Sequence, residues 1–447
     1  MTGGATPEDV AVIGGGVVGL CCAAELLRAG HRVTLVEPGA FGGRHGASYG
    51  NGAWLSPASV VPMSVPGLWR RVPGFLADPL GPLAIRPAAL PRLAPWLLRF
   101  LLAGCTERRV AGIARALAPL LADAPARHAA LAAEAGVAEL IRRDGLLYAY
   151  PSRRAFEAEG LAWRLRRDNG IAWTELDGPA LRARVPTLSA RYGFGALVEA
   201  GGHCHDPGAY LAALADHLAG RGLAVRRTRA TGFALAGGRL EAVLTEAGPL
   251  ACTRAVVAAG IRSPALARAA GDRVPLAAER GYHAVVVGAR RGPPLPVMPS
   301  DGRQANTPTR EGLRVSGQVE LAATDAPPDW RRARLLLDHA LATYDGLADE
   351  VGTGGADRVT TWMGHRPSTP DGLPVIGRAA RCPAVIYAFG HGHVGLAAAP
   401  ATAGLVASLV GGTAPGFDLA PYAPGRFRLR PGAGRQPPDA GLGPRSR

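Results

Sequence analysis

The sequence predicts an α/β fold, α+β overall, in which a Rossmann-type dinucleotide-binding domain is interleaved with a second domain built on a mixed β-sheet. A complete strand, helix and strand unit lies near the start, at residues 10–37. Strand-like runs and helical patterns alternate over residues 145–344, and a second glycine-rich loop between a strand and a helix follows at residues 390–395. Because the two glycine loops lie far apart in the chain, we expect one interleaved fold rather than a detachable module.

The N-terminal unit begins with an apolar strand at residues 10–13, which runs into a glycine turn. An apolar helix is predicted over Leu20–Ala29, and it ends at Gly30, a common residue just after a helix. A second strand, Arg32–Val36, ends directly before Glu37. This order is typical of a dinucleotide-binding βαβ unit.

The glycines and the acid of this unit have separate physical roles. Gly14 permits the tight turn, Gly16 lets backbone N–H groups approach a pyrophosphate, and Gly19 lets the helix pack closely on the sheet. Glu37 is placed to accept hydrogen bonds from ribose hydroxyls and to repel a ribose phosphate, so the unit favours FAD or NAD over NADP. The alternative is a glycine-rich turn with a purely structural role.

Composition indicates a large globular protein. The 447 residues suit two or three domains, and 48% of them are hydrophobic while 19% are charged. The net charge is +15, but the arginines are scattered without a long basic run, which favours a solvated basic surface over nucleic-acid binding. All 50 basic residues are arginine, so no lysine is present to form a Schiff base.

Cysteine usage and hydropathy indicate the compartment. The six cysteines show no CxxC motif and no metal spacing, which favours buried thiols and a cytoplasmic location. Residues 10–24 are apolar like a signal peptide, yet the acidic Glu8 and Asp9 precede them where a signal is basic. The uncharged stretch 382–417 is interrupted by glycine, histidine and proline, so we expect a core element there rather than a membrane span.

The segments after the first unit predict a loop and a helical layer. Gly42–Gly52 is glycine-rich and polar, as expected of a loop that wraps a cofactor. Helical spacing at Pro91–Gly104 and Val110–Ala135 predicts an inserted helical layer. Within it, Leu90–Leu102 is amphipathic, basic and aromatic; it suits either a membrane surface or packing against the rest of the protein, and the latter is the commoner arrangement.

The second half of the chain adds two helices and a series of strands. Ala209–Ala219 is a predicted helix with Asp206 as its N-cap, and Asp329–Tyr344 is another. Residues 232–253 predict a β-meander, and residues 431–447 predict a disordered tail rich in Gly, Pro and Arg. The other predicted strands are Gly145–Tyr150, Tyr192–Glu199, Ala224–Thr228, Ala255–Gly260, Gly281–Gly288 and Leu313–Leu321.

The C-terminal loop Gly390–Gly395 is the second constellation with chemical meaning. It ends a strand and begins an apolar helix, so its N–H groups and the helix dipole are placed to stabilise negative charge. A reduced flavin carries such charge at its pyrimidine end. His391 and His393 have the spacing of metal ligands, but no acid or cysteine lies near them in sequence, so we expect no metal.

These motifs, in this order, resemble the family of FAD-dependent amine oxidoreductases, the DAO family, which includes D-amino-acid dehydrogenase, glycine oxidase and sarcosine oxidase. The similarity extends over about residues 8–420 and is closest to the D-amino-acid dehydrogenase branch. The segments that carry this closer similarity are Ser48-Tyr49-Gly50-Asn51-Gly52, Val61-Pro62-Met63 and Asp78-Pro79-Leu80-Gly81-Pro82-Leu83.

The resemblance implies a noncovalent FAD site made from separate parts of the chain. In the sarcosine branch a cysteine attaches FAD, and Gly364 stands at the matching position here. The residues implied for the ADP part are Gly14, Gly16, Gly19 and Glu37; for the flavin and ribityl chain, Ser48, Asn51 and Gly52; beside the pyrophosphate, Gly260; and facing the flavin, Gly390, Gly392 and Gly395.

The resemblance also implies three residues at the substrate. Arg366, in a Gly-x-Arg-Pro motif, is expected to bind the substrate carboxylate, because a guanidinium gives two parallel hydrogen bonds. The alternative is a structural arginine that caps carbonyls. Tyr282 is a second expected substrate contact, with a core tyrosine as the alternative, and His365 replaces the usual leucine and either tunes specificity or packs.

The implied reaction is FAD-dependent oxidative deamination of a small amino acid, expected to be a D-amino acid. Hydride transfer to flavin N5 gives an imino acid and then a 2-oxo acid, and electrons pass to a quinone or another carrier, with Leu90–Leu102 as a possible membrane-surface contact. The missing lysine favours weak oxygen reactivity, although other oxidases of the family lack it. Alternatives are a peroxide-producing amino acid or amine oxidase, a dehydrogenase for a cyclic secondary amine of the D-proline type, and a noncatalytic flavin-binding redox partner.

The same resemblance gives the expected domain boundaries. Residues 1–55, 200–274 and 360–430 are expected to form the FAD-binding domain, and residues 56–199 and 275–359 the substrate-binding domain.

Overall fold

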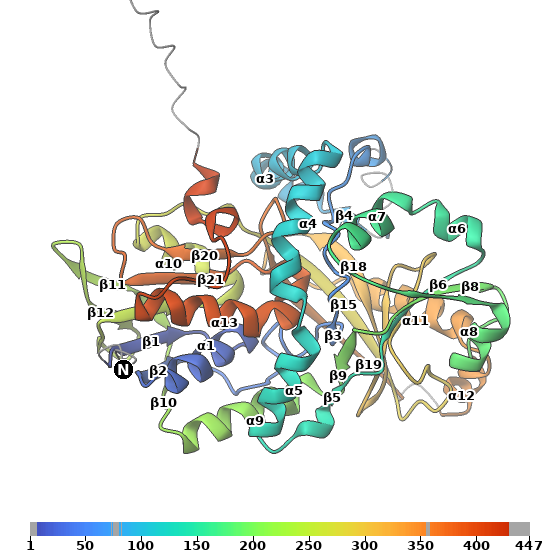
Figure 1. Ribbon diagram of the computed structural model, residues 1–447, viewed down its shortest axis with the longest axis horizontal. Helices are drawn as coiled ribbons and strands as arrows, with labels where there is room; N and C mark the ends of the chain where they lie inside the picture. The colour runs from blue at the N-terminus through green and yellow to red at the C-terminus, as the bar shows by residue number, and fades with distance from the viewer. Residues whose placement is uncertain (1–6, 73, 75–79, 82, 355–357, 429–447) are drawn as a thin grey trace, which may run out of the picture.

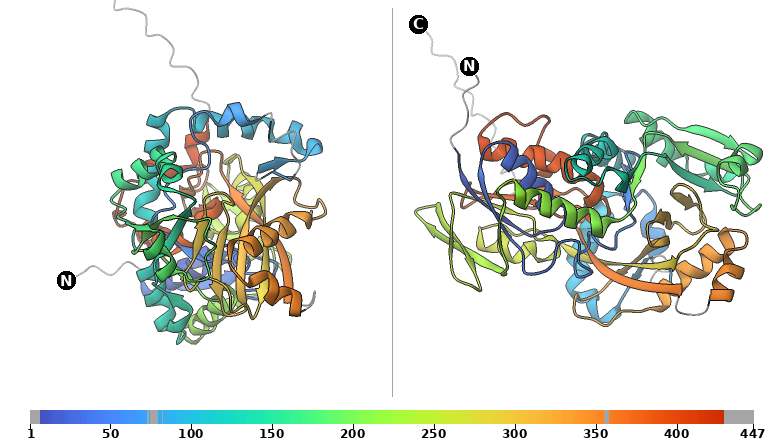
Figure 2. Two further views of the ribbon diagram at one scale, coloured as in Figure 1. Left: turned by 90° about the vertical axis from the view of Figure 1, so that its right-hand side faces the viewer. Right: turned by 90° about the horizontal axis from the view of Figure 1, so that it is seen from below.

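The computed structural model describes residues 7–428 except 73, 75–79, 82 and 355–357, so the predicted tail at 431–447 lies outside the described residues. Two sheets dominate the molecule and lie side by side in Figure 1. The β11–β12 hairpin (Ala230–Ala236 and Arg239–Thr245) projects at one end, and β6 (Leu146–Tyr150) and β8 (Phe194–Val198) lie at the other, as Figures 1 and 2 show. The predicted α/β fold is therefore confirmed.

The first sheet has six strands in the order β10-β2-β1-β14-β21-β20, and all neighbours are parallel except β20 and β21. Ile13 pairs with Val36 on one side and Val257 on the other, so these strands end at the same edge. That edge begins the cofactor site. The strands are β1 Asp9–Ile13, β2 Arg32–Val36, β10 Ala224–Arg226, β14 Arg254–Val257, β20 Val375–Arg378 and β21 Val385–Phe389.

Helices α1 (Val17–Arg28), α9 (Pro207–Gly220) and α13 (Gly395–Gly411) share one hydrophobic core with this sheet. Asp206 caps α9 as predicted, with its carboxylate accepting from Ala209 N at 3.0 Å. The β-meander of β11, β12 and β13 (Leu250–Ala251) belongs to a different core cluster, together with α10 (Ser263–Ala269). The sheet is thus packed with helices on one side and with the meander and α10 on the other.

The apolar segment 392–411 is long and apolar enough to cross a membrane, but 67% of its most apolar stretch is buried inside the molecule. Helix α13 packs against α1, α4 (Glu107–Leu121) and α5 (Ala124–Glu134). The bent pair Pro87–Ala103 and Glu107–Glu134 passes the same length test when taken together, with a 95° angle at the break. The burial of α13 agrees with the core element expected there.

The second sheet has nine strands, in the order β19-β15-β18-β17-β16-β6-β8-β7 with β4 paired to β18. Helix α11 (Arg331–Thr343) packs on β15 and β18 through Leu336 and Leu337. The strands not yet given are β4 Leu83–Ile85, β7 Thr174–Asp177, β15 Ala277–Val287, β16 Val297–Pro299, β17 Ala305–Thr309, β18 Gly312–Leu321 and β19 Val359–Ser368.

Short elements connect the two sheets. A small sheet pairs β3 (Trp54–Leu55), β9 (Gly202–Cys204) and β5 (Ile141–Arg142). Four further helices are α6 Arg153–Glu157, α7 Gly160–Asp168, α8 Gly178–Arg184 and α12 Leu347–Gly354.

The inserted helical layer differs from its prediction in one respect. Helix α3 (Leu90–Ala103) matches the expected Pro91–Gly104, but the expected Val110–Ala135 helix is two helices, α4 (Glu107–Leu121) and α5 (Ala124–Glu134). Residues 122–123 form a turn between them, and Pro125 then stands in the first turn of α5, where its missing N–H costs nothing.

Two segments also lie across the predicted domain boundaries. Strand β19 pairs with β15 in the second sheet, although residues from 360 onward were assigned to the FAD-binding domain. Helices α4 and α5 pack on α13, although residues 56–199 were assigned to the substrate-binding domain. The chain crosses between the two units more often than motif order alone indicates.

Candidate active site

A single large cavity of about 1700 Å³ brings the two glycine loops together. Its lining begins at Glu37 and Gly14, passes the loop at residues 42–53, and reaches Arg366 on β19 and the loop at 390–395. Small-molecule sites commonly enclose about 300 to 1,000 Å³. The cavity is therefore large enough for a dinucleotide and a substrate together.

The ADP end of the cavity depends on glycines with no room for a side chain. Gly14 has φ +109°, and a Cβ there would lie 2.5 Å from the carbonyl oxygen of Ala258. A Cβ on Gly19 would lie 1.8 Å from the carbonyl oxygen of Gly14, which is the close helix-to-strand packing predicted for it. Gly16 lines the cavity as the N-cap of α1.

Glu37 is held in place at the end of β2. Its Oε2 accepts a hydrogen bond from Gly15 N and its Oε1 accepts one from Gly39 N, each at 2.8 Å. His45 Nε2 lies 3.6 Å from Oε1. The carboxylate lines the cavity with its orientation set by backbone donors, which suits the ribose contact expected of it.

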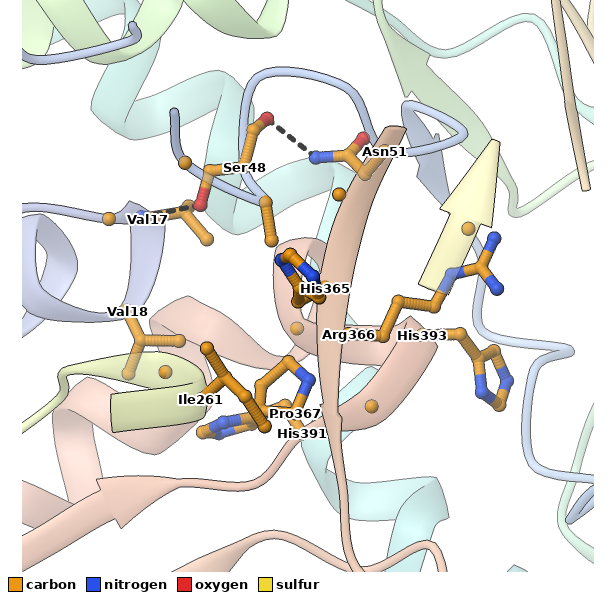
Figure 3. Close-up of a pocket in the computed structure, with 18 of the residues that line it drawn as sticks. Val17, Val18, Ser48, Asn51, Ile261, His365, Arg366, Pro367, His391 and His393 are labelled. Carbon is orange, nitrogen blue, oxygen red and sulfur yellow. Dashed lines mark hydrogen bonds between the residues drawn. The ribbon is translucent and has the colours of Figure 1, made fainter. Parts of the chain in front are cut away.

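The loop at residues 42–53 lies along the cavity, and its hydrogen bonds fix its shape. Ser48 Oγ accepts from Val17 N at 3.1 Å, which caps the start of α1, and Asn51 Nδ2 donates to Ser48 O at 2.7 Å (Figure 3). Asn51 Oδ1 accepts from Ala53 N at 2.6 Å. Ser48, Asn51 and Gly52 all line the cavity, and their contact with the flavin stays a prediction.

The second glycine loop opens the N-terminus of α13 toward the cavity. Gly390 has φ +83° and Gly392 has φ +54°, conformations that favour glycine. Gly395 begins α13, which has no side-chain cap at its N-terminus. Since Gly390, Gly392 and Gly395 line the cavity, N–H groups at the start of this helix are placed to interact with an anionic ligand there.

Arg366 lines the same cavity from β19. Its Nη1 donates to Gln318 O at 2.9 Å and its Nη2 to Gly317 O at 3.3 Å. These carbonyls sit at a β-bulge in β18, where the register with β15 shifts and Gln318 has φ +58°. A guanidinium has five N–H donors, so anchoring through two of them leaves donors to bind a carboxylate.

Glu279 is a buried acid that the sequence analysis did not assign. It lies directly opposite Arg366 in the register of β15 and β19 and is 3% exposed. Burial raises the pKa of Glu279, and the nearby Arg366 charge opposes that shift. Burial likewise lowers the pKa of Arg366, opposed by Glu279. Each charge partly offsets the cost of burying the other.

Tyr282 does not line the cavity in this structure, which corrects the expectation that it contacts the substrate. Its ring is 1% exposed in the core under α11, and its hydroxyl donates to Glu320 Oε2 at 2.6 Å and accepts from Asp329 N at 3.0 Å. Gly281 lines the cavity instead, and a Cβ there would lie 2.4 Å from the Arg366 guanidinium carbon. Neighbouring residues of a strand face opposite sides, so the glycine makes room for Arg366 and the tyrosine faces away.

His365 lines the cavity, but its neighbours are not the Gly317 and Gln318 carbonyls that hold Arg366. Burial lowers its pKa, as does the charge of Arg280, and its Nε2 is buried without a hydrogen-bond partner among the described residues. Residues that follow one another on a strand face opposite sides. His365 therefore extends from the other side of β19 than Arg366, as Figure 3 shows.

His393 is a cavity residue that the sequence analysis weighed only as a metal ligand. Its ring is open to the cavity, and the Arg366 charge contributes to its low pKa, so the two side chains are near each other (Figure 3). His391 instead places Nε2 at 3.0 Å from Thr402 Oγ1. Among the described residues, no group of three or more potential metal ligands is present. The sequence signal that could have placed His393 at the cavity is the alternation of glycine and histidine in the loop expected to face the cofactor.

Comparison with known proteins bears on this geometry. A family model described as "DAO: FAD dependent oxidoreductase" matches residues 9–409. The chain belongs to this family. It is an FAD-dependent oxidoreductase, and the glycine cradles, the held Glu37 and the cavity volume fit that cofactor.

Individual relatives span nearly the whole chain. The chain is 51% identical over 420 residues to a D-amino-acid oxidase of Bradyrhizobium diazoefficiens, covering 94% of this chain and 99% of the relative. It is 31% identical over 426 residues to D-amino acid dehydrogenase 2 of Ralstonia nicotianae, covering 93% and 99%. Glycine oxidase from Geobacillus kaustophilus shares the fold, with a TM-score of 0.71, 22% identity and coverage of 95% and 100%.

Proposed function

We propose that this DAO-family member catalyses oxidative deamination of an amino acid, and that the substrate is a D-amino acid. The observation that carries the proposal is Arg366, a guanidinium anchored by the bulge carbonyls of β18 and open to the same cavity as the FAD-binding motifs. Relatives with both 51% and 31% identity are named for D-amino acids, which supports that stereochemistry.

The protein's contribution is to bind and orient the substrate. Arg366 binds the carboxylate through its remaining donors, and the pair of hydrogen bonds limits rotation of the bound acid. Gly281 leaves room for the Arg366 guanidinium, and its strand partner Gly364 packs against the Trp362 ring. FAD supplies the two-electron chemistry that converts the amine to an imine. Hydrolysis of that imine yields a 2-oxo acid and ammonia.

FAD is proposed to bind noncovalently. None of the described residues that line the cavity is a cysteine, and Gly364 packs against the Trp362 ring, where a Cβ would lie 2.0 Å from the ring. A cysteine at that position would displace the tryptophan. Release of flavin by acid or heat, followed by its recovery in the supernatant, tests this directly.

The electron acceptor is proposed to be a quinone or another carrier reached at a membrane surface. Helix α3 packs Trp96 and Phe100 onto the second sheet, which is the packing role expected of it. Its opposite face exposes Leu98 by 59% and Leu102 by 48%, and Trp69, which follows the Leu68 packed against the same cluster, is 61% exposed. Binding to anionic lipid vesicles that is lost in a Leu98→Gln, Leu102→Gln variant supports this contact.

Molecular oxygen is a second candidate acceptor. The relative that shares 51% identity is named an oxidase, whereas the relative at 31% identity is named a dehydrogenase. The two candidates predict different products in air. An oxidase yields one hydrogen peroxide per amino acid consumed, and a dehydrogenase yields little peroxide but reduces a quinone analogue.

The test of the reaction itself is anaerobic reduction of the holoenzyme by a panel of D-, L- and N-alkyl amino acids. We expect D-amino acids to bleach the flavin absorbance and L-amino acids to leave it unchanged. Preference for N-alkyl or cyclic amines would support the secondary-amine alternative. A flavin that stays oxidised with every member of the panel refutes the proposal and supports a noncatalytic redox partner.

A further inference from the structure

His393 occupies a position in the active site that the carboxylate clamp does not explain. It follows Gly392 in the short 3-10 turn Gly392–Val394, directly before α13. The two side chains, one from this loop and one from β19, extend to the same side in Figure 3, and the Arg366 charge acts on the His393 ring. An imidazole is thus open to the cavity next to the guanidinium.

Arg366 leaves the amino end of a bound amino acid without a partner, because a guanidinium only donates hydrogen bonds. An amino group held at this point needs an acceptor close to Arg366. The carbonyls of Gly317 and Gln318 each accept one hydrogen bond from Arg366, and Glu279 is not among the described residues that line the cavity. Among the side chains that line the cavity, His393 carries a ring nitrogen that can accept, and it lies beside Arg366.

His365 and Asp325 are two further polar side chains that line this end of the cavity. His365 interacts with the backbone of Thr324 and with the charges of Arg280 and Arg262. Asp325 follows Thr324 in that turn and also lines the cavity.

We propose that the His393 imidazole accepts a hydrogen bond from the amino group of an amino acid whose carboxylate is bound by Arg366. The inference rests on the proposed function and adds the residue that recognises the amine. Desolvation inside the cavity, with a contribution from the Arg366 charge, lowers the pKa of His393 to about 4, so the ring is neutral at pH 7 and one ring nitrogen can accept. Two fixed contacts, at carboxylate and amine, leave a single orientation for the Cα–H bond.

The experiment compares two ligands of the same shape on the holoenzyme. The dissociation constant of D-norvaline comes from the concentration dependence of anaerobic flavin reduction, and that of pentanoate, which lacks the amine, from the flavin absorbance shift. In His393→Phe we expect the constant for D-norvaline to rise about tenfold or more, and the constant for pentanoate to change less than about threefold. His393→Asn or His393→Gln, which restore an acceptor, should recover part of the loss.

The matched variant is His365→Phe, which should leave the ratio of the two dissociation constants unchanged. Equal weakening of both ligands in His393→Phe, or no change in either, overturns the assignment of His393. Failure of every amino acid to reduce the wild-type flavin is a separate outcome, because it removes the proposed function before any variant is compared. A normal wild type with an unchanged ratio refutes the His393 inference alone.

Discussion

The two ends of the cavity are built in different ways. At the ADP end, Gly14, Gly19 and Glu37 lie within 24 consecutive residues, and β1, α1 and β2 place them with short local connections. At the substrate end, Arg366 on β19 meets the bulge of β18 and the loop before α13, which are brought together by sheet pairing and packing. Local motifs thus specify the first end, while the second depends on the register of distant strands.

The largest effect is expected at the ADP end, from Gly19→Ala. A Cβ would lie 1.8 Å from the Gly14 carbonyl oxygen, which is backbone and does not move aside without separating α1 from β1. We expect affinity for FAD to fall more than about 100-fold and the melting temperature to drop. Flavin content after gel filtration and a thermal melt measure both.

The control for Gly19→Ala is Gly404→Ala in α13. A Cβ at Gly404 has no atom within 4 Å, so the change should be tolerated and add up to about 1 kcal/mol of helix propensity. Equal flavin content in Gly19→Ala and Gly404→Ala contradicts the packing role of Gly19.

Arg366→Ala gives the next largest effect, and it separates the two ends. We expect carboxylate binding to weaken by about 2 to 5 kcal/mol, because the variant removes the guanidinium that binds the carboxylate. It also leaves the negative charge of the buried Glu279 without the Arg366 charge that opposes it. FAD content should stay close to that of wild type. Pentanoate titration of the flavin spectrum measures the loss, and unchanged affinity shows that Arg366 is only a cap for the Gly317 and Gln318 carbonyls.

Glu37→Ala is the converse variant at the ADP end. It removes the acceptor for Gly15 N and Gly39 N together with the expected ribose contact, so we expect FAD to bind about 10- to 100-fold more weakly. The Michaelis constant for the amino acid at saturating FAD should not change. If that constant rises instead, the two ends are not independent. Glu37→Gln, which keeps one acceptor oxygen, should lose less affinity than Glu37→Ala.

The contrast also explains which parts of the site the sequence predicts. The βαβ unit, the Asp206 cap and both glycine loops follow from local chemistry, and the structure has them where expected. Glu279 and Tyr282 belong to one strand, and choosing between its two faces requires knowing which partner carries Arg366. A shift of one residue reverses every side chain of a strand, and Tyr282, which the sequence places at the substrate, packs in the core in this structure. His393 was missed because its neighbour, Arg366, comes from a different element.

Tyr282→Phe tests that choice of face, and its expected effect is the smallest. The variant removes the hydrogen bond to the Glu320 carboxylate and the one from Asp329 N, so we expect the free energy of unfolding in urea to fall by about 1 to 3 kcal/mol. Tyr150→Phe is a matched control away from the cavity, since its hydroxyl also donates to a carboxylate, Glu159, and accepts from Trp163. Both variants should keep the wild-type Michaelis constant. A tenfold rise in that constant for Tyr282→Phe, with stability unchanged, would place Tyr282 at the substrate and show that the substrate end rearranges when it is filled.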